Sequence, residues 1–121
     1  MVIAFPEPVL EHNPLHLELT ISTTLGISAQ DAQRKVRRYF VDHVNMFITP
    51  HSPLLVMLDD HTFYWRFPLI FSLGRQGRLG QVGEVDVDAH SGELLVSETL
   101  VQEINTNAHR LAQRTPPAPE Q

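Results

Sequence analysis

The sequence predicts a small α+β domain in which an antiparallel sheet of about four strands packs against an N-terminal helix, with a second helix trailing at the C-terminal end. Three observations predict this class. Apolar and polar residues alternate from Val82 to Ala89, which is the period of a half-buried strand. The alternation meets a turn at Ser91-Gly92 and then resumes. Two other stretches, beginning near Ser28 and Ser97, repeat their apolar residues at helical spacing.

Composition limits the number of domains and the class of partner. The 121 residues are expected to form one domain over 15–113, because a division would leave cores too small to offset chain entropy. Nine Lys and Arg residues face 14 Asp and Glu residues, so we expect no nucleic-acid partner. The first residues lack the pattern of a secretory signal and no stretch is long enough to span a bilayer, so we expect no membrane partner and a cytoplasmic location.

The N-terminal region is predicted to be extended. Pro6, Pro8 and Pro14 interrupt regular pairing, so residues 1–14 are expected to form an arm that runs over the surface. Leu15, Leu17 and Leu19 then alternate with polar residues, which predicts a strand at a sheet edge or one that pairs with a second copy.

The clearest helix is predicted from Ser28 to about Phe47. Ser28 is an N-cap with Asp31 in the first turn, and the prolines of the following T-P-H-S-P loop stop the helix. The apolar face includes the aromatic residues Tyr39, Phe40 and Phe47. The other face carries a basic cluster, which we interpret as a solvated helix face. The basic cluster consists of Arg34, Lys35, Arg37 and Arg38.

Two strands are predicted over 54–58 and 63–73, joined by a polar connection. Pro68 marks an edge, a bulge or a bend, because it cannot donate a ladder hydrogen bond. Alternation assigns Trp65, Phe67, Leu69 and Phe71 to the core. It places Tyr64, Arg66 and Ile70 on the opposite sheet face, as candidate partner-binding residues.

A loose glycine connection is expected over 74–80, followed by strands over 82–89 and 93–96. Arg75 and Arg78 in this connection are candidates for contact with an acidic partner. Asp88 is predicted to accept backbone hydrogen bonds in the turn that contains Ser91 and Gly92, which fixes the hairpin register. Ser97 caps the last helix, and the proline-rich tail 114–121 is predicted to be disordered.

The hairpin resembles one that is common in PepSY or YpeB-type propeptide domains, which reads G-x-V-x-V-D-A-x-T-G-E followed by a hydrophobic residue. The positions that match this pattern are Gly83, Val85, Val87, Asp88, Ala89, Ser91, Gly92 and Glu93, with Ser91 where threonine is usual. The resemblance extends over roughly 27–96. It implies a helix packed on a small antiparallel sheet and a regulatory or inhibitory binding role.

The sequence contains no recognisable catalytic or metal-binding motif. It has no cysteine, its seven histidines form no helical H-x-x-x-H pair, and no serine lies in a G-x-S-x-G context. The glycine loop lies between strands, so it differs from a phosphate-binding loop that leads into a helix. We therefore expect no cofactor, no metal and no enzymatic activity.

Two classes of function follow. The favoured class is a non-catalytic protein-binding or regulatory module that engages a partner, or a second copy in a homo-oligomer, through the open sheet face or the strand over 15–21. The alternative is a small ligand-binding protein or enzyme whose pocket on the sheet face uses Arg66, Asp86, Asp88 and His90.

Overall fold

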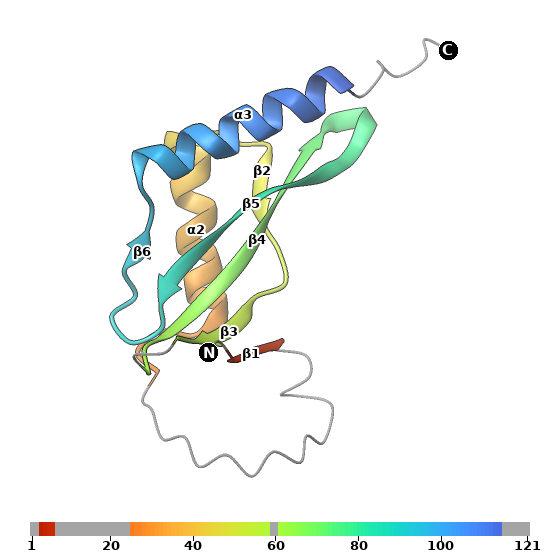
Figure 1. Ribbon diagram of the computed structural model, residues 1–121. Helices are drawn as coiled ribbons and strands as arrows, with labels where there is room; N and C mark the ends of the chain where they lie inside the picture. Colours follow the sequence, from red (N-terminus) through yellow and green to blue (C-terminus); the bar gives the residue numbers. More distant parts are fainter. Residues whose placement is uncertain (1–2, 7–24, 59–60, 115–121) are drawn as a thin grey trace.

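The computed structural model describes residues 3–6, 25–58 and 61–114. In these residues two helices cover one face of a single antiparallel sheet (Figure 1), which confirms the predicted α+β class. The elements in chain order are β1 (Ile3–Pro6), α2 (Ala29–His43), β2 (Ile48–Pro50), β3 (Leu54–Met57), β4 (Phe63–Leu73), a 3-10 turn (Gly74–Gln76), β5 (Gly77–Asp88), β6 (Leu94–Leu95) and α3 (Glu98–Arg114).

The long β4–β5 hairpin is the centre of the sheet. The strand order is β1-β3-β4-β5-β6, and β2 pairs with β4 as well. Strands β3 and β2 follow one another along the same edge of β4, β3 beside residues 63–66 and β2 beside residues 69–71. Strand β5 occupies the whole opposite edge of β4, so this ribbon connects all other strands.

One hydrophobic core joins both helices to the sheet. From β4 it takes Trp65, Phe67, Leu69 and Phe71, the four residues that alternation assigned to it. Helix α2 contributes Val36 and Phe40, and α3 contributes Ile104 and Ala108. The alternation of strand side chains therefore fixed the buried face, because a strand turns every second residue to the same side.

Helix α2 begins as predicted and ends earlier than predicted. The Ser28 hydroxyl accepts a hydrogen bond from the Asp31 N–H at 3.1 Å, which caps the first turn. At the other end, the N–H groups of Val44 and Asn45 both donate to the Phe40 carbonyl, and the helix stops at His43. The predicted end at Phe47 was wrong, because the chain turns here to enter β2.

The segment predicted as a proline loop contains strand β2. Its last residue, Pro50, pairs with Leu69. The next residue, His51, donates its N–H to the Pro68 carbonyl at 2.9 Å. The N–H and C=O of a strand residue point to the same neighbouring strand. The Pro68 carbonyl faces the edge where β3 ends and β2 begins, so the N–H that proline lacks would face this same junction. Proline is accommodated there because the ladder on that edge changes strands.

The connection between β4 and β5 is tight, and the expectation of a loose loop over 74–80 was wrong. Gly74 and Gly77 adopt φ values of 33° and 67°, which side chains disfavour, and they close the reversal around a 3-10 turn. Strand β5 therefore begins at Gly77 and pairs with the end of β4, with register shifts after Leu69 and after Phe71.

At the N-terminal end, the expectation that prolines prevent pairing was wrong for residues 3–6. Strand β1 pairs antiparallel with β3, with Pro6 opposite Leu54 at the end of the ladder. Proline is tolerated at such a position because it terminates an edge strand. The strand predicted over 15–21 and the tail after Arg114 lie outside the described residues.

Helix α3 packs on β5 from the same side as α2. The Ser97 hydroxyl accepts the Leu100 N–H at 3.1 Å, so its predicted role as a cap is confirmed. Asn107 donates its side-chain amide to the Val82 carbonyl at 2.9 Å. A Cβ at Gly83 would lie 3.0 Å from the Ile104 side chain, so glycine permits this close approach of helix and strand.

Candidate interaction surfaces

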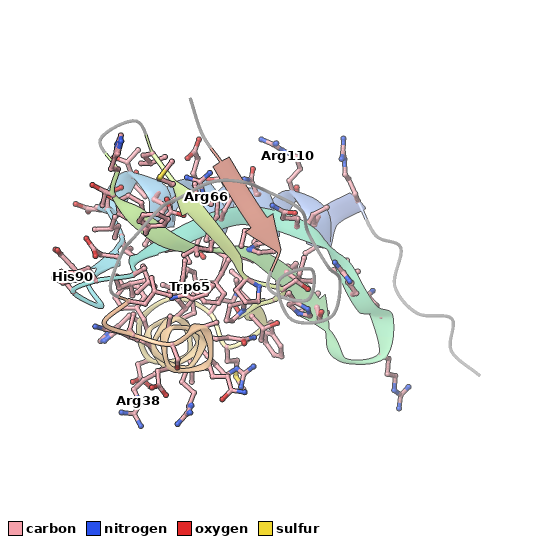
Figure 2. The ribbon with its side chains drawn as sticks, turned by 90° about the horizontal axis from the view of Figure 1, so that it is seen from below. Arg38, Trp65, Arg66, His90 and Arg110 are labelled. Carbon is pink, nitrogen blue, oxygen red and sulfur yellow. The ribbon has the colours of Figure 1, made fainter. Side chains whose placement is uncertain are left out.

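The face of the β4–β5 ribbon that points away from both helices is called the outer face. Its central residues are Tyr64 and Arg66 on β4, opposite Asp88 and Asp86 on β5. Figure 2 shows Trp65 directed toward α2 and Arg66 on the other side of the sheet. On β3, Leu54 lies beside Arg66, and on β6, Leu95 lies beside Asp86. Side chains from four adjacent strands therefore form a row across this face.

Arg66 and Asp86 form a two-pronged ion pair in this row. The Arg66 Nε lies 2.8 Å from one Asp86 carboxylate oxygen, and Nη2 lies 2.9 Å from the other. The two side chains are 28% and 22% exposed. The hydrogen bond to Asp86 raises the pKa of Arg66 above its usual value against the effect of burial. The pair therefore presents a neutral, geometrically fixed polar centre between Leu54 and Leu95.

Ile70 is not an accessible member of the outer face. Its side chain is 2% exposed, in contrast to the expectation that it contacts a partner. It lies between Thr49 on β2 and Gln81 on β5, next to the register shift that follows Leu69. Ile70 and Val56 are buried without belonging to the main core, so apolar packing also exists on this side of the sheet. Tyr64 and Arg66 remain the partly exposed candidates.

The remaining candidate residues do not gather around Tyr64 and Arg66. Arg75 and Arg78 are exposed at the tip of the β4–β5 hairpin, where Arg78 pairs with Ser72. Six residues of extended strand separate Ser72 from Arg66, a distance of about 20 Å. The predicted contacts Leu15, Leu17 and Leu19 lie outside the described residues. The structure thus places the basic residues of the hairpin tip on a separate surface.

The turn between β5 and β6 is organised by Asp88. One oxygen of its carboxylate accepts the N–H groups of His90 and Ser91 at 2.8 and 2.9 Å, which are the hydrogen bonds the sequence predicted. The N–H groups of Ser91 and His90 lower the pKa of Asp88. Gly92 has a φ of 79°, and its carbonyl accepts a hydrogen bond from the Lys35 ammonium of α2. The turn is therefore tied to the helix as well as to its own strand.

Metal-binding side chains do not cluster in the described part of the chain. Within residues 3–6, 25–58 and 61–114, no three His, Asp or Glu side chains are placed to hold a metal ion. His43 is exposed and its ring lies 5.1 Å from that of Tyr39, whereas His51 bonds the Thr49 hydroxyl at 3.1 Å. No helix in this part of the chain is long and apolar enough to cross a membrane.

A groove between α2 and β6 is the feature that sequence reasoning missed. It has a volume of about 400 Å³ and combines apolar and basic side chains. Its lining residues are Lys35, Arg38, Tyr39, Asp42 and His43 from α2, with Leu94 and Val96 from β6 and the segment after it. The spacing of Lys35, Tyr39 and His43 by four residues marks one helix stripe. Only the tertiary structure sets this stripe beside β6.

No family model, curated protein or solved structure matches this chain. Function is therefore inferred from the geometry of its surfaces.

Proposed function

We propose that this protein is a non-catalytic protein-binding or regulatory module of PepSY-like type. The observation that carries the proposal is the outer face, where Tyr64 and the Arg66–Asp86 pair are partly exposed on the most extensively paired strands of the sheet. Both helices pack on the other face. A rigid surface with an aromatic ring and an arginine, bordered by leucines, has the composition of an energetically important protein contact.

The alternative of a ligand pocket or active site on the sheet face has less support. Its polar residues would be Arg66, Asp86, Asp88 and His90. Arg66 and Asp86 bond each other, and the Asp88 carboxylate is engaged by the backbone of its own turn. Carboxylates used in this way stabilise the hairpin, and neither is poised as a free acid or base for a substrate.

The PepSY-like assignment rests on the hairpin motif together with its fold. The motif places Asp88 where its carboxylate closes the turn, and Gly92 where positive φ is required. The motif carries the resemblance, and a helix packed on an antiparallel sheet is the fold that the resemblance implies. In this proposal the partner is a protein, or a second copy of the chain, and neither a nucleic acid nor a membrane.

Site-specific photo-crosslinking tests the use of the outer face. A photoreactive phenylalanine analogue in place of Tyr64, in the full chain in its native cells, is expected to give one discrete protein adduct. The same analogue in place of Glu103, an exposed residue of α3 on the helix side of the sheet, is the matched control and is expected to give none. An adduct of twice the chain mass would identify the partner as a second copy, which light scattering of the purified protein would confirm.

The proposal fails if the Tyr64 position gives no discrete adduct, or if the Glu103 position gives the same adducts with equal yield. Equal yields would show that crosslinking follows exposure and not a specific face.

A further inference from the structure

Strand β6 ends the sheet, and its outer edge offers backbone hydrogen-bonding groups. The Asp88 N–H donates to the Glu93 carbonyl at 2.8 Å, so this pair is of the hydrogen-bonded type. Pairs alternate in an antiparallel ladder, so the next pair, Val87 with Leu94, is not hydrogen-bonded. The N–H and C=O of Leu94 therefore point away from β5. No described strand lies beyond β6 (Figure 1).

This edge lacks the usual features that prevent strand addition. Natural edge strands commonly carry lysine, proline or a bulge that discourages pairing with another chain. The residues from Leu94 to Val96 include neither charge nor proline, and Leu95 is 40% exposed. The edge is short, so it offers pairing to a single short segment and not to an extended sheet.

The groove beside β6 is suited to the side chains of such a segment. A strand added to β6 turns every second side chain toward α2, on the side where Leu94 and Val96 meet Tyr39. These three residues form the apolar floor of the groove. Its volume of about 400 Å³ leaves space for side chains that no described residue fills.

The charge of the groove selects the kind of segment. Helix α2 carries four of the nine Lys and Arg residues of the chain, although the chain as a whole has a net charge of −5. Lys35 and Arg38 line the groove, against one carboxylate, Asp42. A segment with acidic and apolar side chains on the same face, two residues apart, would complement both properties.

We propose that the outer edge of β6 and the α2–β6 groove bind an extended acidic segment of a partner protein, which joins the sheet as an additional strand. This inference rests on the proposed function as a protein-binding module, but it uses a surface distinct from Tyr64 and Arg66. The backbone of Leu94 supplies the ladder hydrogen bonds, Tyr39 and Val96 contact apolar side chains, and Arg38 attracts the acidic ones.

A second copy of this chain fits the same edge less well. Symmetric antiparallel pairing of two β6 strands would place both α2 helices on the same face of the joined sheet. The basic stripes that contain Lys35 and Arg38 would then approach each other, and like charges at such an interface are repulsive.

The test uses the full chain and a fluorescein-labelled octapeptide that repeats valine-threonine-glutamate-threonine, so that valine and glutamate lie on the same face of the added strand. Binding is followed by fluorescence anisotropy. The same peptide with lysine in place of each glutamate is the charge control and is expected not to bind. Arg38→Glu replaces an attraction by a repulsion and is expected to weaken binding about tenfold or more. Arg37→Glu makes the same charge change on the same helix, outside the groove, and is expected to change affinity by no more than about twofold.

Amide hydrogen exchange measured by NMR tests the strand pairing directly. The Leu94 N–H is expected to exchange rapidly in the free protein and to become protected when the glutamate peptide binds. The Leu95 N–H, which points toward β5, is expected to keep its rate and serves as the internal control.

Several results would overturn this inference. They are binding weaker than about 1 mM, equal losses for Arg37→Glu and Arg38→Glu, and binding without protection of Leu94. Protection of Leu94 in the free protein would also overturn it, because the chain itself would then cover the edge. The crosslinking result at Tyr64 is independent of all four, so this inference can fail while the proposed function stands.

Discussion

The two faces of the β4–β5 ribbon follow the same alternation and have different physical roles. On the helix side, Phe67 is fully buried in a core shared with α2 and α3. On the outer face, the side chains of Arg66 and Asp86 are 28% and 22% exposed and bond each other. Neighbouring residues of one strand therefore belong either to the core or to the surface that we propose binds a partner. Substitutions on the two faces should differ in their effect on stability.

The largest expected effect is on the helix side. Phe67→Ala leaves a cavity where both helices meet the sheet, so the free energy of unfolding should fall by about 3–5 kcal/mol. Tyr64→Ala, the outer-face control on the same strand, should cost about 1 kcal/mol or less. Urea denaturation of the two variants measures both values. Equal losses would show that the outer face is as important for stability as the core.

A smaller effect is expected from filling the space that Gly83 leaves for α3. Gly83→Ala brings a methyl group to 3.0 Å from the Ile104 side chain, so this side chain and its packing on β5 have to shift. The expected loss is about 1–3 kcal/mol, as for other overpacked sites. Glu84→Ala, an exposed neighbour on the outer face, should have almost no effect on thermal unfolding. Equal stability of Gly83→Ala and the native chain would contradict the close approach.

At the turn end of the outer face, Asp88→Ala removes two backbone hydrogen bonds and should cost about 1 kcal/mol. Because the folded state lowers the pKa of Asp88, its stabilising contribution is complete above the usual Asp value of 3.8. This contribution is lost as the pH falls through the lower folded value. Asp88→Asn retains an acceptor without the charge, so its stability should fall less steeply below about pH 4. If the free energy of unfolding of the native chain and of Asp88→Asn fell equally with decreasing pH, the result would contradict this role.

The smallest expected effect concerns the Arg66–Asp86 pair. A double-mutant cycle with Arg66→Ala and Asp86→Ala should give a coupling energy of about 0.5–1 kcal/mol, because the pair is partly exposed and lies directly across two strands. Increasing salt should reduce this value only slightly, since the contact is two-pronged. A coupling above about 2 kcal/mol would place the pair among core interactions and remove the contrast between the two faces.

The candidate surfaces were partly predictable, and the reason differs from residue to residue. Alternation correctly placed Tyr64 and Arg66 opposite the core, because side-chain direction in a strand depends only on local geometry. It also put Ile70 on that face, but the burial of Ile70 depends on the neighbouring strands and on a register shift. The groove beside β6 was missed, since Tyr39 and Leu94 are far apart in the sequence.

The sequence by itself determined the class of fold, the caps at Ser28 and Ser97, the core face of β4 and the hydrogen bonds of Asp88. These features depend on residues that are close in the chain, where backbone geometry limits the choices. Only the tertiary structure decided where α2 ends, that residues 48–50 pair with β4, and that β5 begins at Gly77. Long-range hydrogen bonds and packing select among locally permitted conformations, and no local pattern encodes which distant strand will supply them.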